Sequence, residues 1–243
     1  MSTKADWFIS WFDTPYYHIL YKNRDDTDAR IFMQNITSYL KLPLNTHILD
    51  LACGKGRHSV FLNSLGYNIT GLDLSENNIL SANLKSNNHL QFGVHDMRDK
   101  LPNKYNAIFN LFTSFGYFED DLEDIQVLKN IKSGLLENGI AVIDFLNVQT
   151  AKQNLVTEEI KIIEDIKFTI KRKIENGFII KEISFTDNQQ HYAFFERVKY
   201  IDYNKFVTYF KSAELKIQHV FGDYKLSPFN EKTSNRLIFV ISK

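Results

Sequence analysis

THILDLACGKGRHSVFLNSLGYNITGLDL, residues 46–74, is the stretch that decides the fold of this chain. An apolar run at 48–51 is typical of a buried strand, and the glycine-bearing loop 52–56 then breaks the pattern. Apolar residues at helical spacing predict a helix over 57–65, and residues 68–72 predict a second strand. The stretch therefore predicts a strand, a loop, a helix and a second strand in succession.

The loop of this unit and the residue after its second strand have the chemistry of a nucleotide-binding site. Gly54 and Gly56 carry no side chains, so backbone N–H groups and the helix N-terminus can approach a ligand there. Asp73 follows Gly54 by nineteen residues, an interval at which a carboxylate accepts hydrogen bonds from ribose hydroxyls. The alternative is an ordinary turn followed by a solvated aspartate.

Two short motifs in this stretch resemble those of a known family. LDLACGKGRHS, residues 49–59, followed by GLDLS, residues 71–75, resembles motifs I and II of the class I S-adenosylmethionine-dependent methyltransferases of small-molecule type. The first motif of that family reads (D/E)-x-G-x-G-x-G. Asp50 matches its acid and the last two glycines are present, while Ala52 replaces the first glycine. From that replacement we expect a backbone without positive φ at this position.

The resemblance implies S-adenosylmethionine as the cofactor and an α/β fold with a doubly wound, mostly parallel seven-stranded sheet. The cofactor-binding residues that it implies are Tyr21, Asp50, Gly54, Gly56, Arg57, His58, Asp73, Leu74, Asp96, Met97 and Asn110. Arg57 and His58 open the helix after the glycine loop, where we expect them to meet the cofactor's carboxylate together with the helix N-terminus.

The segment after the predicted third strand, 90–94, resembles a further contact of that family. There an acid meets the adenine exocyclic amine and the next residue packs on the ring, which implies these roles for Asp96 and Met97. Arg98 and Asp99 follow directly, so a solvated charged loop is the alternative.

The predicted fourth strand, 105–110, ends in Asn110, where the resembled family often has a residue that faces both cofactor and substrate. The loop TSFGYF, 113–118, lies at the same strand ends, where open parallel sheets bind ligands. We therefore expect Phe115 and Tyr117 on the substrate side. A connector whose aromatic side chains are simply buried is the alternative.

Residues 1–45 predict an N-terminal helical lid. Pro15 suits the first turn of a helix, on which Tyr17, Tyr21 and Arg24 share one face. The resemblance implies that tyrosines of such a segment touch the cofactor, and we place Tyr17 on the substrate side of it. The alternative is that both tyrosines pack the segment against the body of the protein.

The pattern of strand and helix repeats after the first unit, which predicts a parallel sheet with right-handed crossovers. The expected cofactor-binding core comprises 46–157 and 202–243, and it ends in a reversed strand pair. Within it, Ser75 is expected to cap a helix that runs through Lys85 and buries Ile79, Leu80 and Leu84 on its inner face.

Residues 158–201 predict an antiparallel meander inserted into this core. Asn176-Gly177 is a strong signal for a two-residue type I′ hairpin, and 187–190 marks a second turn. Alternation of apolar and polar residues over 167–171 and 178–185 indicates strands. We expect this meander to cover one side of the cleft.

Composition limits the classes of partner. The chain of 243 residues balances 29 basic against 29 acidic side chains and has no basic stripe, so nucleic acid is not an expected partner. It has no run of eighteen apolar residues and no secretory signal at its start. A single cysteine fits a reducing cytoplasm. The expected partner is a small molecule, and nothing indicates an oligomeric state.

The chemistry that these patterns favour is methyl transfer by direct in-line displacement, which needs orientation and a dry pocket more than an acid–base pair. No histidine or cysteine spacing indicates a metal site, and no residue is assigned as catalytic. One rival is an NAD(P)-binding oxidoreductase, whose GxGxxG fingerprint would need glycine where Ser59 stands. The other is a non-catalytic module that binds an adenosyl ligand on the same fold.

Overall fold

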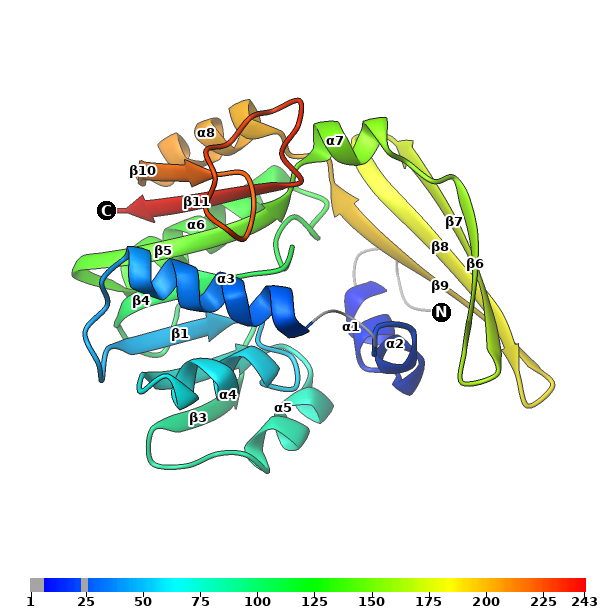
Figure 1. Cartoon of the computed structure of the whole chain (residues 1–243), viewed down its shortest axis with the longest axis horizontal. Coiled ribbons are helices and arrows are strands. Elements are labelled where there is room, and N and C mark those ends of the chain that lie inside the picture. The colour runs from blue at the N-terminus through cyan, green and yellow to red at the C-terminus, as the bar shows by residue number, and fades with distance from the viewer. Residues whose placement is uncertain (1–6, 23–25) are drawn as a thin grey trace.

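Two β-sheets and the helices around them form the part of the chain that the computed structural model describes, residues 7–22 and 26–243 (Figure 1). The larger sheet holds β1 (His47–Leu51), β2 (Asn68–Asp73), β3 (Leu90–Val94), β4 (Tyr105–Asn110), β5 (Leu135–Leu146), β10 (Lys216–Phe221) and β11 (Arg236–Ser242). The smaller sheet holds β6 (Glu158–Ile163), β7 (Ile166–Glu175), β8 (Phe178–Asp187) and β9 (Gln190–Lys199). The helices are α1 (Trp7–Phe12), α2 (Pro15–Leu20), α3 (Asp26–Tyr39), α4 (Arg57–Ser64), α5 (Glu76–Asn83), α6 (Asp121–Gly134), α7 (Val148–Gln153) and α8 (Tyr203–Ser212).

The larger sheet has the strand order β10-β11-β5-β4-β1-β2-β3. β1 is central and pairs in parallel with both β2 and β4, while β11 runs antiparallel to β5 and β10. The chain leaves β1 toward one edge and later returns to β4 on its other side, which makes this pair the topological switch point. The doubly wound, mostly parallel seven-stranded sheet with its reversed strand pair is confirmed.

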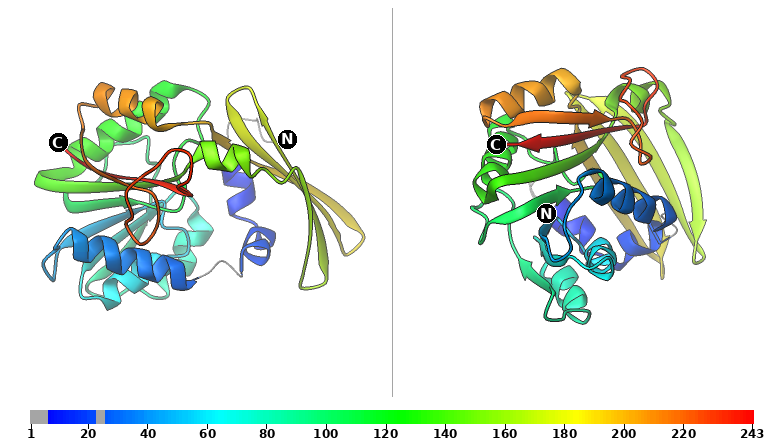
Figure 2. Two further views of the ribbon diagram at one scale, coloured as in Figure 1. Left: turned by 45° about the horizontal axis from the view of Figure 1, so that its top comes forward. Right: turned by 60° about the vertical axis from the view of Figure 1, so that its left-hand side comes forward.

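Helices cover both faces of this sheet, because neighbouring strand residues point to opposite sides. Leu49 of β1 packs in one core cluster with Leu128 of α6. Ile48, its neighbour, packs in a second cluster with Phe32 of α3. The two layers of helices are visible on either side of the sheet in Figure 2.

Helix α5 buries Ile79 as expected, but not the other two apolar residues predicted for its inner face. Ser75 caps it as predicted, but Leu80 and Leu84 are exposed, and the helix already ends at Asn83. Its buried residues include Ile79 and Ala82. A Cβ added to Gly56 would lie 3.2 Å from the Ala82 Cβ atom. The face of α5 that carries Ala82 therefore packs closely against the glycine loop.

The smaller sheet is the antiparallel meander expected for the insertion. Asn176 and Gly177 have φ values of 50° and 76°, and Asn188 and Gln189 have 48° and 66°, so both predicted hairpin turns have the left-handed pair of a type I′ turn. A third such turn at 164–165, with φ of 51° and 65°, joins β6 to β7. It contains no glycine or asparagine, so the sequence shows no signal for it.

Helices α1 and α2 lie between the two sheets, beside β9 (Figure 1). Thr14 caps α2 by accepting a hydrogen bond from the Tyr17 N–H at 3.1 Å, and Pro15 occupies the first helical position. Arg24, expected on the face of Tyr17 and Tyr21, lies outside the described residues. We call residues 7–22 the lid segment below.

Candidate active site

The loop between β1 and α4 is bound to β2 and uses left-handed backbone at three positions. The N–H groups of Ala52 and Cys53 both donate to the Leu72 carbonyl, at 2.7 and 3.0 Å. Ala52, Gly54 and Gly56 have φ values of 67°, 55° and 72°. The expectation of an ordinary φ at Ala52 was wrong. The turn places Ala52 in the left-handed region, which is unfavourable for any residue with a Cβ. Alanine has the smallest side chain of such residues.

The two glycines of this loop serve different purposes. A Cβ on Gly56 would lie 2.5 Å from the Phe92 ring, so a side chain there would collide with the core. A Cβ on Gly54 would meet nothing within 4 Å. Gly56 therefore allows close packing, whereas Gly54 borders open space in which a ligand can reach the backbone.

Asp73, at the end of β2, is held against the same loop. The Gly54 N–H donates to Asp73 Oδ2 at 2.8 Å, and the Ser75 N–H donates to Oδ1 at 3.0 Å. Burial raises the pKa of this carboxyl, while the two backbone hydrogen bonds oppose that rise. Leu74, next in the chain, packs partly buried against the core. The carboxylate is thus fixed in position before any ligand binds.

Asp50 lies deeper than the other predicted cofactor residues. It is almost fully buried, and the Ser59 hydroxyl donates to its Oδ2 at 2.5 Å. The Ser59 backbone N–H also donates to this carboxylate. Helix α4 has Gly56 at its N-cap and no side-chain cap of its own, so Asp50 supplies the missing acceptor from β1. Burial raises the Asp50 pKa to about 6.

Arg57 and His58 stand in the first turn of α4. The Arg57 Nη2 and His58 Nε2 atoms are 3.0 Å apart, and the His58 ring lies 4.2 Å from the ring of Phe112. His58 therefore joins the glycine loop to the loop that follows β4.

Asp96 is engaged by its neighbour Arg98. The guanidinium donates to both carboxylate oxygens, at 2.6 to 3.1 Å, and its Nη1 also donates to Glu123 at 2.9 Å. Although burial alone would raise the Asp96 pKa, the bonds from Arg98 lower it below its usual value. Met97 packs against the core, and its carbonyl accepts from Asn130. The adenine contact expected of Asp96 and Met97 stays a prediction, with the Asp96 carboxylate held in place by Arg98.

Asn110, at the carboxyl end of β4, is fully buried, and only the nitrogen of its side-chain amide has hydrogen-bond partners among the described residues. Its amide nitrogen donates to the Leu51 carbonyl at 3.1 Å, beside the glycine loop. Its Oδ1 atom is buried and has no hydrogen-bond partner among the described residues. A buried acceptor without a partner is costly, so this atom favours a ligand that brings a donor.

The two residues that follow Leu111 adopt left-handed backbone, with φ of 58° at Phe112 and 63° at Thr113. Both are tied to Asp144 of β5. The Phe112 N–H donates to Asp144 Oδ2 at 2.8 Å, and the Thr113 N–H donates to the Asp144 carbonyl at 2.9 Å. Arg236 of β11 donates through Nε to Asp144 Oδ1 at 2.8 Å and through Nη2 to Thr113 Oγ1 at 3.0 Å.

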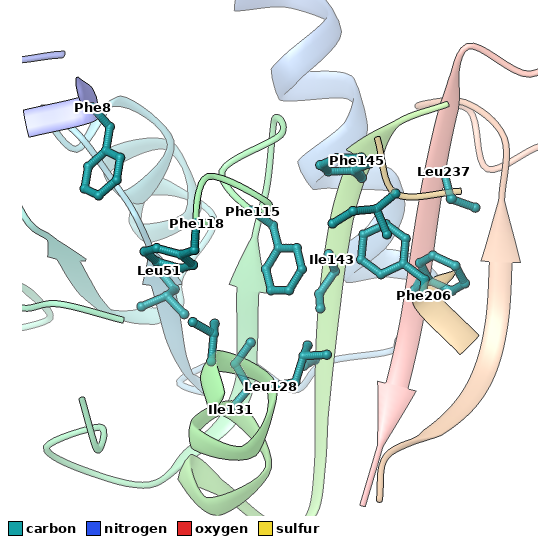
Figure 3. Packing of buried hydrophobic residues seen from close by; sticks show 14 of the residues in the cluster. Phe8, Leu51, Phe115, Phe118, Leu128, Ile131, Ile143, Phe145, Phe206 and Leu237 are labelled. Atoms are coloured by element: carbon teal, nitrogen blue, oxygen red, sulfur yellow. The ribbon is translucent and has the colours of Figure 1, made fainter. Parts of the chain in front are cut away.

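The two aromatic residues predicted on the substrate side differ in position. Phe115 is 1% exposed and packs on Phe206 of α8, among the buried side chains of Figure 3. It therefore belongs to the core, because α8 covers this part of the loop. Tyr117 is only partly buried, donates to the Thr113 carbonyl at 2.5 Å, and packs against Phe12 of the lid segment.

The lid segment is anchored to the smaller sheet by hydrogen bonds to β9. Glu196 Oε1 accepts from the Trp11 indole at 2.9 Å and from the Tyr21 hydroxyl at 2.5 Å. Lys181 of β8 also bonds to Tyr21 and lies 4.4 Å from its ring. Tyr17 packs on Trp11 and Tyr21. Tyr21 is thus bound to the meander, and its contact with a cofactor stays a prediction.

The lid segment is also bound to the corner that holds Asp73. The Asp13 carboxylate accepts hydrogen bonds from the Ser75 hydroxyl and from Asn77 Nδ2, the latter at 2.6 Å. It also adds to the rise in the Asp73 pKa through its charge. One edge of the lid segment therefore lies over the residues expected to meet ribose.

Sequence patterns missed Asp13, Glu196, Asp144 and Arg236 as parts of this site. Asp144 ends a predicted strand, and that position is a usable signal at the ligand edge of a parallel sheet. Glu196 and Arg236 carry no local signal, because their partners lie far away in the chain.

Neither a metal centre nor a membrane span is found in the parts of the chain that the structure describes. Over residues 7–22 and 26–243 no group of three or more histidine, cysteine, aspartate or glutamate side chains is arranged to hold a metal ion. No helix in those same ranges is long and apolar enough to cross a membrane.

Known proteins resemble this chain in sequence and in fold. The methyltransferase-domain family matches residues 48–139. The putative methyltransferase YqeM of Bacillus subtilis is 33% identical over 107 residues, which cover 42% of this chain and 43% of that protein. The chain thus matches less than half the length of this curated relative.

Two solved structures share the fold over nearly the whole chain. An S-adenosylmethionine-dependent methyltransferase from Clostridium acetobutylicum gives a TM-score of 0.78 at 19% identity, with 93% of this chain and 95% of that one covered. The CcbJ methyltransferase from Streptomyces caelestis gives 0.78 at 15% identity, with 99% of both chains covered. Residues 48–139 thus match a methyltransferase domain, and the doubly wound sheet has the fold of S-adenosylmethionine-dependent methyltransferases.

Proposed function

We propose that this protein transfers the methyl group of S-adenosylmethionine to a small-molecule acceptor by direct in-line displacement. The observation that carries the proposal is the buried Asn110 Oδ1, which has no partner among the described residues at the carboxyl end of β4. Its side chain is bound to Leu51, directly before the glycine loop. An acceptor in this place suits the ammonium of an amino-acid-like ligand.

The residues of the glycine loop and β2 fit the rest of such a cofactor. Gly54 leaves open space beside its backbone, and Asp73 is held there as an acceptor for ribose hydroxyls. Arg57, His58 and the N-terminus of α4 are the groups that would meet a carboxylate. When bound, S-adenosylmethionine supplies a methyl group on a cationic sulfur, which is already activated for displacement.

The lid segment and Tyr117 would exclude water from the reacting groups. Trp7, Phe8 and Phe12 all pack on the Tyr117 ring, with ring centroids 5.4 to 6.3 Å apart. An aromatic enclosure of this kind favours orientation and desolvation, which are the main needs of a displacement at carbon. Residues 1–45 are therefore proposed as a lid, and 158–201 as the surface on which it rests.

The acceptor that we propose to test first is an amine on a sugar. Two proteins that share the fold are the sugar N-methyltransferase KedS8 and the amino pentose methyltransferase CalS10, with TM-scores of 0.72 and 0.71. The balance of 29 acidic and 29 basic residues supports a small molecule rather than a nucleic acid. The lone cysteine fits work in a reducing cytoplasm.

The NAD(P) alternative is less well supported, because Ser59 stands at the third fingerprint position and is committed to Asp50. Isothermal titration with S-adenosylmethionine, S-adenosylhomocysteine and NADH separates the two. Binding of NADH alone would refute the proposal. Transfer of a labelled methyl group to amino sugars or to a metabolite extract then distinguishes an enzyme from a binding module.

A further inference from the structure

The turn at Phe112 and Thr113 joins the cofactor side of the proposed site to its acceptor side. The Phe112 ring lies against His58 in the first turn of α4. The Thr113 carbonyl accepts the hydroxyl of Tyr117, which packs on the lid segment. Asn110 lies just before the turn, and its Oδ1 has no hydrogen-bond partner within residues 7–22 and 26–243. Its amide nitrogen makes a long contact of 3.5 Å to the Ser114 carbonyl on the other side of the turn.

This turn needs outside support to keep its conformation. Two consecutive residues with a Cβ occupy the left-handed region, φ 58° and 63°, which is unfavourable for each. Strain of this kind persists only where surrounding contacts fix it, and it concentrates at functional sites. The fixing contacts are therefore informative.

Asp144 and Arg236 supply those contacts from two neighbouring strands. Asp144 is fully buried and binds both turn residues, one through its carboxylate and one through its carbonyl. Arg236 binds Asp144 and the Thr113 hydroxyl with the same guanidinium. Since the ion pair costs desolvation, its use here points to control of geometry more than to stability.

A second buried ion pair in the chain lacks this feature. Lys199 and Asp124 are as deeply buried, with Nζ and Oδ2 2.5 Å apart, and they connect β9 to α6. The Asp124 carboxylate bonds to Lys199 and not to Phe112 or Thr113, and the pair reaches the loop after β4 through the Lys199 backbone N–H, which donates to the Gly116 carbonyl at 2.7 Å. The Lys199–Asp124 pair therefore serves as a comparison for burial and charge without side-chain contact to Phe112 or Thr113.

We propose that Asp144 and Arg236 are positioning residues for methyl transfer. They hold Phe112 and Thr113 in the left-handed conformation, and this sets the places of Asn110, His58 and Tyr117 relative to one another. The proposal rests on the proposed function, since it assigns these contacts to the same site.

The test uses the full chain with Asp144→Asn, and with Asp124→Asn as the matched control. S-adenosylhomocysteine is titrated by calorimetry well below the melting temperature, which gives stoichiometry and dissociation constant separately. Exchange of the Phe112 and Thr113 amide hydrogens is followed in the same proteins. We expect Asp144→Asn to bind at least fivefold more weakly with stoichiometry near one, and to exchange these two amides faster.

The control should lose thermal stability but keep its dissociation constant within twofold and its exchange at the turn unchanged. Arg236→Lys, which keeps the charge but not the two-point contact, should fall between wild type and Arg236→Met. A merely structural role would lower the melting temperature or the stoichiometry and leave the dissociation constant alone, and that result would overturn the proposal.

Failure of the wild-type protein itself to bind S-adenosylhomocysteine would instead overturn the proposed function. Amide exchange at Phe112 and Thr113 would then decide the positioning claim by itself, and unchanged exchange in Asp144→Asn would end it.

Discussion

The Gly54 N–H donates to the carboxylate of Asp73 across 2.8 Å, so the loop after β1 and the end of β2 are joined by a hydrogen bond between residues nineteen positions apart. The bond aligns an acceptor carboxylate with the open side of the loop. We therefore expect the ribose of a bound cofactor on the Asp73 side of the loop.

Asp73→Ala should weaken binding of S-adenosylmethionine by about 1–3 kcal/mol, because ribose hydroxyls lose a charged acceptor. That range corresponds to roughly a fivefold to 150-fold rise in the dissociation constant, measured by calorimetry. Asp99→Ala, which removes an exposed carboxylate from the loop after β3, is the control and should bind as wild type. An unchanged dissociation constant for Asp73→Ala would refute the ribose contact.

Gly54→Val should abolish cofactor binding and leave the fold largely intact. The new side chain would occupy the open space beside the loop. The backbone would also be strained, because valine disfavours the left-handed region at φ 55°. Gly177→Val is a matched control, since Gly177 also has positive φ and an added Cβ there would meet nothing within 4 Å, but it lies in a hairpin of the smaller sheet. Both variants should lose similar stability by thermal denaturation. Normal binding by Gly54→Val would contradict the loop assignment.

Asp13→Ala should loosen the lid segment from the ribose corner. The variant loses the bonds to Ser75 and Asn77, so we expect faster dissociation of S-adenosylhomocysteine in stopped-flow measurements, by a few-fold. Lys22→Ala breaks an exposed ion pair between the same segment and Glu164, and such pairs contribute little. Equal dissociation rates in the two variants would show that Asp13 does not restrain the lid segment.

Asp50 should make the folded protein less stable as pH rises from about 4 to about 6. Its pKa in the folded state is raised to about 6, mainly by burial, so the native state binds a proton that the unfolded state has already lost. Its favourable contribution is complete below the unfolded pKa and is lost as pH rises through the folded pKa. The loss is at most roughly 3 kcal/mol.

Urea denaturation of wild type and Asp50→Asn at pH 4 and pH 7 measures this effect. The difference in unfolding free energy between the two proteins should move in favour of the variant at the higher pH. Parallel pH profiles would show that Asp50 titrates normally.

The larger sheet and the glycine loop could be predicted from the sequence, because the patterns that indicate them are local. Strand runs, Gly54, Gly56 and the interval to Asp73 all lie within one stretch, and Asn176-Gly177 marks its hairpin by backbone preference alone. The left-handed φ of Ala52 was missed because the constraint comes from bonds to β2, outside the motif.

The rest of the candidate site is tertiary in origin. Whether Phe115 faces a ligand or the core depends on α8, which follows it by some ninety residues in the chain. Trp11 and Glu196 are separated by 185 positions, and Arg236 lies 92 positions after Asp144. Periodicity and spacing cannot predict such pairings, because the residues next to each of them in the sequence form no motif.

The bonds of Trp11 and Tyr21 to Glu196, and of Tyr16 to Asp187, have a consequence for protein engineering. These bonds link residues 7–22 to 158–199, although most of the larger sheet separates the two segments in sequence. A chimera that imports only the meander from a related enzyme would leave three aromatic side chains facing foreign partners. We therefore expect a transplanted meander to keep these bonds only when residues 7–22 come from the same donor.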